Sequence, residues 1–273
     1  MSGKVTIATC QFPVGSDVQG NTSYIQMQMR IACSRGAAIA HFSECSLSGY
    51  AGMDFNDFQT QDKHQLVRSL QQIQDTAREL KLWVIVGSHH HEPGMEKPYN
   101  SLYVINPQGE IAARYDKRLL TGGTTGWDQN YYSPGRHPVI FSLNGIRCGL
   151  LICHEWRYGE LYRQYNRLGT QLIFQSWYDG NMTYPEFRDE GQNLGEVIIG
   201  TVRGNAANNN LWISASNTSQ KESCFPAFVV RPDGMMPGRL RRNETGVLIN
   251  TIDTSQQFED PSEHLRDSLD HLL

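Results

Sequence analysis

The sequence predicts an α/β fold in which helices cover β-sheets. Strand-like apolar runs alternate with helix-like amphipathic segments along the chain, and hairpin signals interrupt the alternation. The 273 residues, 39% of them hydrophobic, suit one large domain with a substantial core. Two packed sheets, each covered by helices, would bury the amphipathic stripes economically in a four-layer α-β-β-α sandwich. The strand content alone also permits a doubly wound sheet.

Local signals predict the individual elements. Asn21 suits the N-cap of a helix that ends near Gly36, and a second helix carries an apolar stripe along residues 66–80. Asn144-Gly145 is a hairpin turn between two strands. The expected strands cover residues 5–10, 37–42, 82–88, 101–106, 111–115, 139–143, 146–152, 172–175, 211–215, 227–231 and 247–252. The expected helices cover residues 21–36, 61–81, 160–168 and 192–207.

Three residues with reactive or charged side chains follow expected strands. Cys153 ends the apolar run 146–152, and Glu44 and Lys117 each come shortly after another strand. A cysteine at a strand-to-helix turn is held rigidly at a sheet edge, where backbone N–H groups are close by. Taken singly, a free cysteine is commonly a core residue, and a glutamate or lysine is commonly solvated. If the three strands end at one sheet edge, the side chains converge on one site.

Sequence blocks around these residues follow a recognisable order. They are Ser43-Glu44 with Gly49-Tyr50, residues 115–120 around Lys117, and residues 153–160 after the cysteine. The supporting blocks are Cys10-Gln11-Phe12-Pro13, Asn21, Tyr99-Asn100-Ser101 and Ser133-Pro134-Gly135. Together they make the chain resemble the nitrilase, or carbon–nitrogen hydrolase, superfamily, whose members carry a Glu…Lys…Cys triad in this order. The resemblance implies a four-layer α-β-β-α sandwich of the nitrilase type over residues 1–255, with a C-terminal tail or short helix over 256–273.

The chain departs from the family pattern at several places. Ser43 and Gly159 stand where prolines are usual, and Asp128 stands where many members have a second glutamate. Asn208-Asn209 replaces a usual Glu-Asn pair. These departures indicate a divergent branch, so the substrates of better-known members do not transfer to this chain.

The chemistry of amide cleavage suits the three triad residues. Cys153 would attack as the thiolate. Glu44 would take the thiol proton, protonate the leaving nitrogen and later activate water. Lys117 would stabilise the oxyanion, with the N–H of His154 as a second donor. Asp128 either supports the lysine or only forms a turn.

Two loops are candidates for substrate selection. Trp177 and Tyr178 follow the strand 172–175, and they either wall a small amide or pack in the core. The loop 121–132 contains glycines that permit close approach or movement. Cys148 is a rival nucleophile, but it lies inside its strand rather than at the end.

The sequence therefore predicts a thiol amidohydrolase that acts on a small non-peptide C–N bond. A simple carboxamide or an N-carbamoyl compound is the preferred substrate class, because nitrile hydrolysis is a minority activity in the family. A nitrilase and an amide-forming acyltransferase are alternatives on the same triad. A non-catalytic interaction protein that kept the fold is an alternative of another class, although retention of Glu44, Lys117 and Cys153 argues against it.

The composition and charge of the chain limit which partners and cofactors we expect. A net charge of −4, with no basic run longer than residues 239–242, disfavours nucleic-acid binding. The chain shows neither a signal-peptide pattern nor an apolar run of membrane length, so we expect no membrane partner. Six cysteines without paired ligand spacing indicate reduced thiols of a cytoplasmic protein. The His89-His90-His91 run is expected in a polar loop, and we expect no metal and no organic cofactor.

We also expect a homodimer or a larger homo-oligomer, because members of the family commonly join their sheets near the helix after the cysteine. That helix carries Tyr158, Leu161, Tyr162 and Tyr165, an aromatic surface of the kind enriched in interfaces. The same tyrosines would otherwise only cover the sheet.

Overall fold

The computed structural model describes residues 3–122 and 127–260. Within these residues the strands form two mixed six-stranded sheets. The first sheet has the order β12-β1-β2-β3-β4-β5, and the second has the order β11-β10-β9-β8-β7-β6. The strands of the first sheet are β1 (Lys4–Gln11), β2 (Ile39–His41), β3 (Trp83–His90), β4 (Tyr99–Ile105), β5 (Ile111–Asp116) and β12 (Gly246–Asp253). Those of the second are β6 (Ile140–Leu143), β7 (Ile146–Ile152), β8 (Leu172–Ser176), β9 (Trp212–Ser216), β10 (Phe228–Val230) and β11 (Gly238–Arg239).

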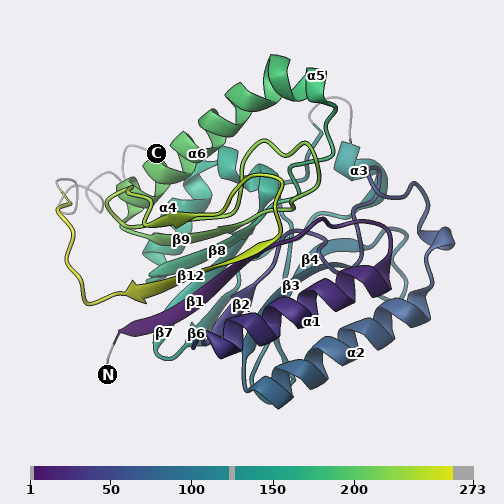
Figure 1. Cartoon of the computed structure of the whole chain (residues 1–273), viewed down its shortest axis with the longest axis horizontal. Helices are drawn as coiled ribbons and strands as arrows, with labels where there is room; N and C mark the ends of the chain where they lie inside the picture. The colour runs from purple at the N-terminus through teal and green to yellow at the C-terminus, as the bar shows by residue number, and fades with distance from the viewer. Residues whose placement is uncertain (1–2, 123–126, 261–273) are drawn as a thin grey trace.

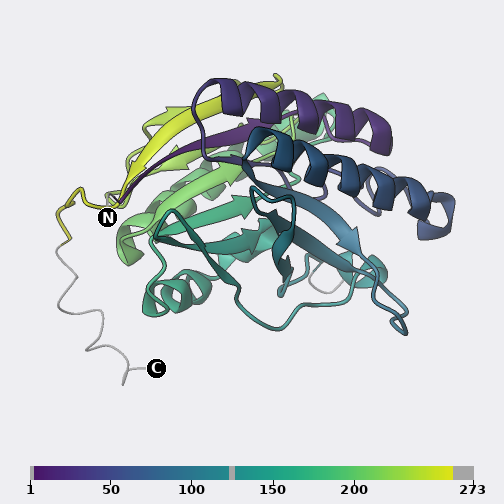
Figure 2. The ribbon, with the colours of Figure 1, turned by 90° about the horizontal axis from the view of Figure 1, so that it is seen from below.

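Helices cover the outer face of each sheet. The crossover helices α1 (Val18–Ser34) and α2 (Lys63–Leu80) join the parallel strands β1, β2 and β3. In the second sheet, α4 (Gly159–Arg167) and α6 (Gln192–Asn209) join the parallel strands β7, β8 and β9. Figures 1 and 2 show the two helix pairs on opposite sides of the packed sheets. The four-layer α-β-β-α sandwich is confirmed, and the doubly wound sheet is excluded.

The central strands of each sheet are buried on both faces. On β1, Val5 and Ile7 face the second sheet, whereas Ala8 and Cys10 face the helices α1 and α2. The second sheet repeats this arrangement, with Leu150 facing the first sheet. Its other face packs against α4 and α6. Burial on both faces explains why the strands are nearly continuous apolar runs in the sequence.

A polar seam around His41 crosses the interior between the sheets. The ring nitrogens of His41 lie 2.9 Å from the hydroxyls of Ser176 and Ser214, which belong to the second sheet. Thr9 of β1 also contacts the Ser214 hydroxyl, at 2.7 Å. Burial lowers the pKa of His41 to about 3, so the ring is neutral at physiological pH. These hydrogen bonds fix the position of one sheet against the other. They do so close to Glu44, which follows His41 by three residues in the sequence.

The structure corrects several expected boundaries. The first helix begins earlier than expected, because Asp17 caps it through the N–H of Gln19. Asn21 lies inside that helix, where its amide donates to the carbonyls of Gly15 and Leu47. His89 and His90 are the last residues of β3 rather than part of a loop. The expected tail over 256–273 lies mostly outside the described residues.

Helix α4 provides a smaller aromatic surface than the sequence indicated. Tyr162 and Tyr165 are fully buried against the second sheet, while Tyr158 is 38% exposed. The two inner tyrosines therefore cover the sheet, and the homo-oligomer stays a prediction. Separately, no helix in the described ranges combines the length and the apolar character needed to cross a membrane.

Replacing His41 should destabilise the fold and change its pH dependence. We expect His41→Ala to lower the free energy of unfolding by about 2–4 kcal/mol, through the cavity and the lost hydrogen bonds. In the wild type, stability should decrease from about pH 6.5 towards pH 3, because the unfolded chain binds a proton that the folded His41 does not. This histidine contributes a slope of at most about 1.4 kcal/mol per pH unit.

Urea unfolding between pH 4 and pH 7.5 measures both effects. The matched control is His64→Ala on the exposed face of α2, which should change stability by less than about 0.5 kcal/mol. A His41→Ala protein that keeps the wild-type slope below pH 6.5 would contradict the assignment.

Candidate active site

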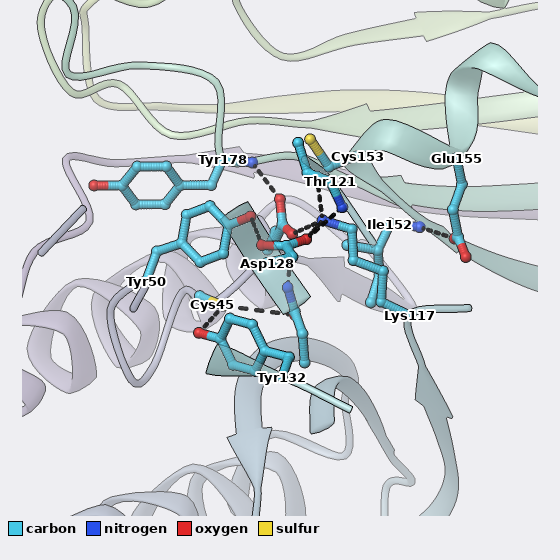
Figure 3. Close-up of polar contacts among 12 residues, drawn as sticks. Cys45, Tyr50, Lys117, Thr121, Asp128, Tyr132, Ile152, Cys153, Glu155 and Tyr178 are labelled. Carbon is cyan, nitrogen blue, oxygen red and sulfur yellow. Dashed lines mark hydrogen bonds and ion pairs between the residues drawn. The ribbon is translucent and has the colours of Figure 1, made fainter. Parts of the chain in front are cut away.

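The three residues of the expected triad lie at strand ends. Glu44 follows β2, and Lys117 directly follows β5. Cys153 directly follows β7 of the second sheet. Carboxyl ends of parallel strands are where open α/β sheets commonly bind ligands. The fold therefore provides the common edge that the sequence argument required, with residues from both sheets (Figure 3).

Lys117 is fully buried, and each N–H group of its ammonium has a hydrogen-bond acceptor. Its ammonium donates to Glu44 Oε1 at 2.8 Å, to Asp128 Oδ2 at 2.7 Å and to Thr121 Oγ1 at 3.0 Å. We call these four residues the lysine cluster. Burial acts to lower the pKa of Lys117, but the two carboxylates outweigh it and raise the pKa well above its ordinary value. The side chain is therefore a fixed cation.

Two further donors orient the Glu44 carboxylate. Asn100, from β4, donates its amide to Oε1 at 2.7 Å. The backbone N–H of Tyr178 donates to Oε2 at 3.0 Å. Burial raises the pKa of Glu44 and Lys117 opposes this, but the charge of Asp128 adds to the increase. Glu44 is thus a carboxylate with an increased affinity for a proton, as a general base requires.

Asp128 reaches the lysine despite its short side chain. It lies in the short helix α3 (Trp127–Tyr131), within the segment 121–132 that the sequence predicted as a loop. Tyr50 donates its hydroxyl to Oδ1 at 2.5 Å, and the N–H of Thr121 donates to Oδ2 at 2.8 Å. Burial opposes ionisation, but Lys117 and these donors lower the pKa of Asp128. Of the two roles left open for Asp128, its position fits support of the lysine. Residues 123–126 of this segment lie outside the described residues.

Cys153 has the features of a nucleophile held in a strained turn. Its φ is +39°, in the left-handed region that non-glycine residues rarely adopt. The residue is partly exposed and begins the 3₁₀ helix Cys153–Arg157. Burial and the charge of Glu44 raise the pKa of the thiol well above its ordinary value, while Lys117 opposes them. The resting sulfur is therefore a thiol within the electrostatic influence of Glu44 and Lys117, and Figure 3 draws it among the residues of the site.

The rival cysteine is placed differently. Cys148 is fully buried between the two sheets, with its sulfur 3.5 Å from the carbonyl oxygen of Ile146. Burial raises the pKa of its thiol. Cys45, next to Glu44, is also fully buried. Neither sulfur is open to a substrate.

Glu155 is a residue that the sequence did not single out. Its fully buried carboxylate accepts the N–H of Ile152 at 2.7 Å, directly before Cys153. It also accepts the N–H of Arg118 at 2.8 Å, directly after the lysine, and the Tyr115 hydroxyl at 2.8 Å. One carboxylate thus joins the cysteine turn to the lysine loop. The sequence did contain a signal for this role. Glu155 follows the strand-end Cys153 by two residues, and backbone N–H groups at the start of a helical turn need an acceptor such as a carboxylate.

The expected pocket residues are placed less favourably. The Trp177 side chain is fully buried and packs against Phe225, so it belongs to the core and not to a pocket wall. Tyr178 is 5% exposed, and its hydroxyl donates to Asp54 at 2.7 Å. Figure 3 shows its ring directed away from Cys153. Tyr178 takes part in the site through its backbone N–H instead.

The other predicted residues lie at the edge of the site or away from it. The His154 ring is partly exposed, and burial and Lys117 lower its pKa, so it is neutral. His89 and His91 pack their rings against Phe58. In the described part of the chain, no three His, Cys, Asp or Glu side chains are arranged to hold a metal ion.

A cysteine, a carboxylate and a fixed ammonium at the ends of two packed sheets suit thiol-dependent acyl chemistry. The family model for carbon–nitrogen hydrolases matches residues 6–258. The chain therefore belongs to the carbon–nitrogen hydrolase family, whose reaction class is the hydrolysis of C–N bonds.

The most similar proteins include omega-amidases. The chain is 29% identical to omega-amidase NIT2 of Homo sapiens over 172 residues, which cover 61% of each chain. It is 27% identical to omega-amidase NIT2 of Bos taurus over 265 residues, which cover 93% of this chain and 90% of that protein. Among solved structures, a mutant of the amidase from Nesterenkonia sp. AN1 in complex with butyramide matches with a TM-score of 0.81 and 21% identity. This match covers 99% of this chain and 96% of that one.

Loss of the Glu155 charge should misalign the site without unfolding the protein. In Glu155→Gln, the amide group cannot accept all the N–H groups that meet the carboxylate. We expect alkylation of Cys153 by iodoacetamide to slow by about tenfold or more, because small displacements of reacting groups are costly. Peptide mapping by mass spectrometry measures the rate.

Glu160→Gln is the matched control, since Glu160 is an exposed acid one turn further along. It should react at the wild-type rate. If Glu155→Gln lowered the melting temperature but left the alkylation rate of the folded protein unchanged, Glu155 would have no positioning role.

Proposed function

We propose that this chain is a thiol amidohydrolase that cleaves a small carboxamide or N-carbamoyl compound. The observation that carries the proposal is the lysine cluster, a buried ammonium that holds Glu44 as a carboxylate beside the thiol of Cys153. Glu44, Lys117 and Cys153 are the catalytic residues in this proposal. The names of the relatives, omega-amidase and amidase, support it.

In the acylation step, Glu44 accepts the thiol proton while the sulfur attacks the carbonyl carbon. The carbonyl oxygen gains the negative charge of a tetrahedral intermediate. Glu44 then gives its proton to the nitrogen, the C–N bond breaks, and ammonia or an amine leaves. The acyl group remains on Cys153 as a thioester. In one solved neighbour, the acetamide moiety of fluoroacetamide is added covalently at the active-site cysteine, which supports this step.

In the deacylation step, Glu44 again accepts a proton first and then donates it. It removes a proton from water as the water oxygen attacks the thioester carbonyl. Collapse of the second tetrahedral intermediate breaks the C–S bond, and the sulfur regains the proton from Glu44. The products are a carboxylic acid and the free thiol. One carboxylate serves both steps, which is why its orientation by Asn100 and Tyr178 matters.

The contacts of Lys117 define how it would act on the oxyanion. All three N–H bonds of the ammonium point at protein acceptors, and the contact with Thr121 is the longest at 3.0 Å. Lys117 therefore stabilises the oxyanion through its nearby positive charge, and directly only if it exchanges the Thr121 contact. The backbone N–H of His154 is the proposed direct donor.

Cys153 should be required for turnover and Cys148 should not. We expect Cys153→Ala to abolish ammonia release from butyramide while the protein stays folded, since the side chain is partly exposed at a turn. Cys148→Ser, with a polar hydroxyl inside the core, should lose some stability but keep much of the activity.

Ammonia release and circular dichroism measure the two effects. Mass spectrometry after brief exposure to fluoroacetamide should find the adduct on Cys153. An adduct confined to Cys148 would refute the assigned nucleophile.

Activity should decrease at acid pH as Glu44 becomes protonated. Because burial and Asp128 raise the pKa of Glu44, kcat/KM should decrease below a pH that is higher than the ordinary glutamate value of 4.5. Asp128→Asn removes a negative charge and should shift this acid limb to lower pH, with a reduced maximum because Lys117 loses a partner.

A pH profile of kcat/KM for butyramide tests the shift, with Asp75→Asn on the exposed face of α2 as the control. The control should keep the wild-type profile. A shift of the Asp128→Asn limb to higher pH would mean that another group controls it.

A further inference from the structure

A further carboxylate, that of Asp179, lies beside the site and takes no part in the proposed mechanism. Asp179 directly follows Tyr178, whose N–H binds Glu44. Burial and the charge of Glu44 raise the pKa of the Cys153 thiol, and the charge of Asp179 adds to the increase. Asp179 is largely buried but keeps some exposure to solvent. A negative charge at this position disfavours the thiolate, so Asp179 does not activate Cys153 and we looked for another role.

The backbone of Asp179 is held rigidly. Its N–H donates to Asn217 Oδ1 at 2.9 Å, and its carbonyl accepts from Asn217 Nδ2 at 3.1 Å. Asn217 is fully buried and also donates to the carbonyl of Phe225 at 2.8 Å. The backbone that carries the carboxylate is thus fixed before any ligand arrives, which reduces the entropy lost on binding.

Asp179 differs from the other acids of the site in its partners. Glu44 and Asp128 share the ammonium of Lys117. Among residues 3–122 and 127–260, no lysine or arginine forms an ion pair with Asp179. Burial raises the pKa of Asp179, and its neutral neighbour Cys224 opposes this increase.

Arg242, which donates to the carbonyl of Ser223 beside Cys224, is already paired. Arg242 contacts Glu222 at 2.6 Å and lies over the ring of Phe187. Largely buried charges in proteins are normally paired. The cation that would complete the surroundings of Asp179 is therefore missing from the described chain.

We propose that Asp179 selects a substrate that carries a positively charged group, such as a primary ammonium, a few bonds from the scissile amide. This inference rests on the proposed amidohydrolase function and names its substrate class. The ammonium supplies the missing counter-ion, and the amide carbonyl lies at Cys153. A substrate carboxylate would meet three acids, Glu44, Asp128 and Asp179, against the single charge of Lys117.

Three matched amides test the selection. They are 4-aminobutanamide (cationic), butyramide (neutral) and succinamic acid (anionic), each with one primary carboxamide. For the wild type, kcat/KM should decrease in that order. Asp179→Asn should lower kcat/KM for 4-aminobutanamide by about tenfold or more, the effect of losing one partly desolvated charge pair. The value for butyramide should stay within about twofold.

Two further variants serve as controls. Asp179→Glu keeps the charge and should restore much of the preference for 4-aminobutanamide. Asp75→Asn, an exposed acid on α2, should leave all three values at the wild-type level. Equal losses on the cationic and the neutral amide in Asp179→Asn would overturn the proposal, as would a wild-type preference for succinamic acid.

A second measurement separates this proposal from the proposed function. If the wild type hydrolysed none of the amides, the amidohydrolase function would fail. Alkylation of Cys153 by 2-chloroacetamide and by its cationic N-(2-aminoethyl) derivative would still test Asp179. Faster reaction of the cationic probe in the wild type but not in Asp179→Asn would support the charge selection, and equal rates in both proteins would refute it.

Discussion

The positive charge of Lys117 is the constraint on which the site depends. Burying an ammonium away from water is costly unless anionic partners and hydrogen bonds surround it, and here all three donors have partners. The same charge favours the ionised forms of Glu44 and Asp128 in a buried position. Removing it would leave two carboxylates close together, and at least one of them would take up a proton. Glu44, Asp128 and Lys117 are therefore one electrostatic unit.

This unit gains its catalytic setting from the packing of two sheets. Lys117 and Asn100 come from the first sheet, whereas Cys153 and Tyr178 follow strands of the second. Glu155 and the His41 seam hold the two halves in register. Side chains on rigid strand ends keep their geometry better than side chains on mobile loops, which suits a reaction that needs aligned atoms.

Much of this arrangement could be predicted from the sequence. The apolar runs gave the strands of both sheets, and the positions of Glu44, Lys117 and Cys153 after strands indicated one edge. Asp128 was harder, because its reach depends on α3 and on the Tyr50 hydroxyl, which lies far away in sequence. Local patterns do not encode such contacts, since they arise only when distant segments pack.

Other features were missed for related reasons. Trp177 occupies a position where an aromatic can face a pocket or the core, and only packing against Phe225 decides between them. Glu155 resembled part of a polar connection, because its N–H partners lie on two separate segments. His89 was expected in a loop on its polarity, yet strand pairing with Asn100 extends β3 past it. Tertiary contacts overrode local propensity in each case.

Because β12 pairs with β1, the first sheet cannot be completed until the end of the chain has been synthesised. All eight residues of β1 pair with β12, from Lys4 with Asp253 to Gln11 with Gly246. During synthesis, the whole second sheet leaves the ribosome before β12 does, so one edge of β1 stays open for tens of seconds at about 5–20 residues per second. An open apolar strand edge invites pairing with other chains. The nascent chain is thus most exposed to aggregation after Cys153 and the second sheet have been made and before the first sheet is closed.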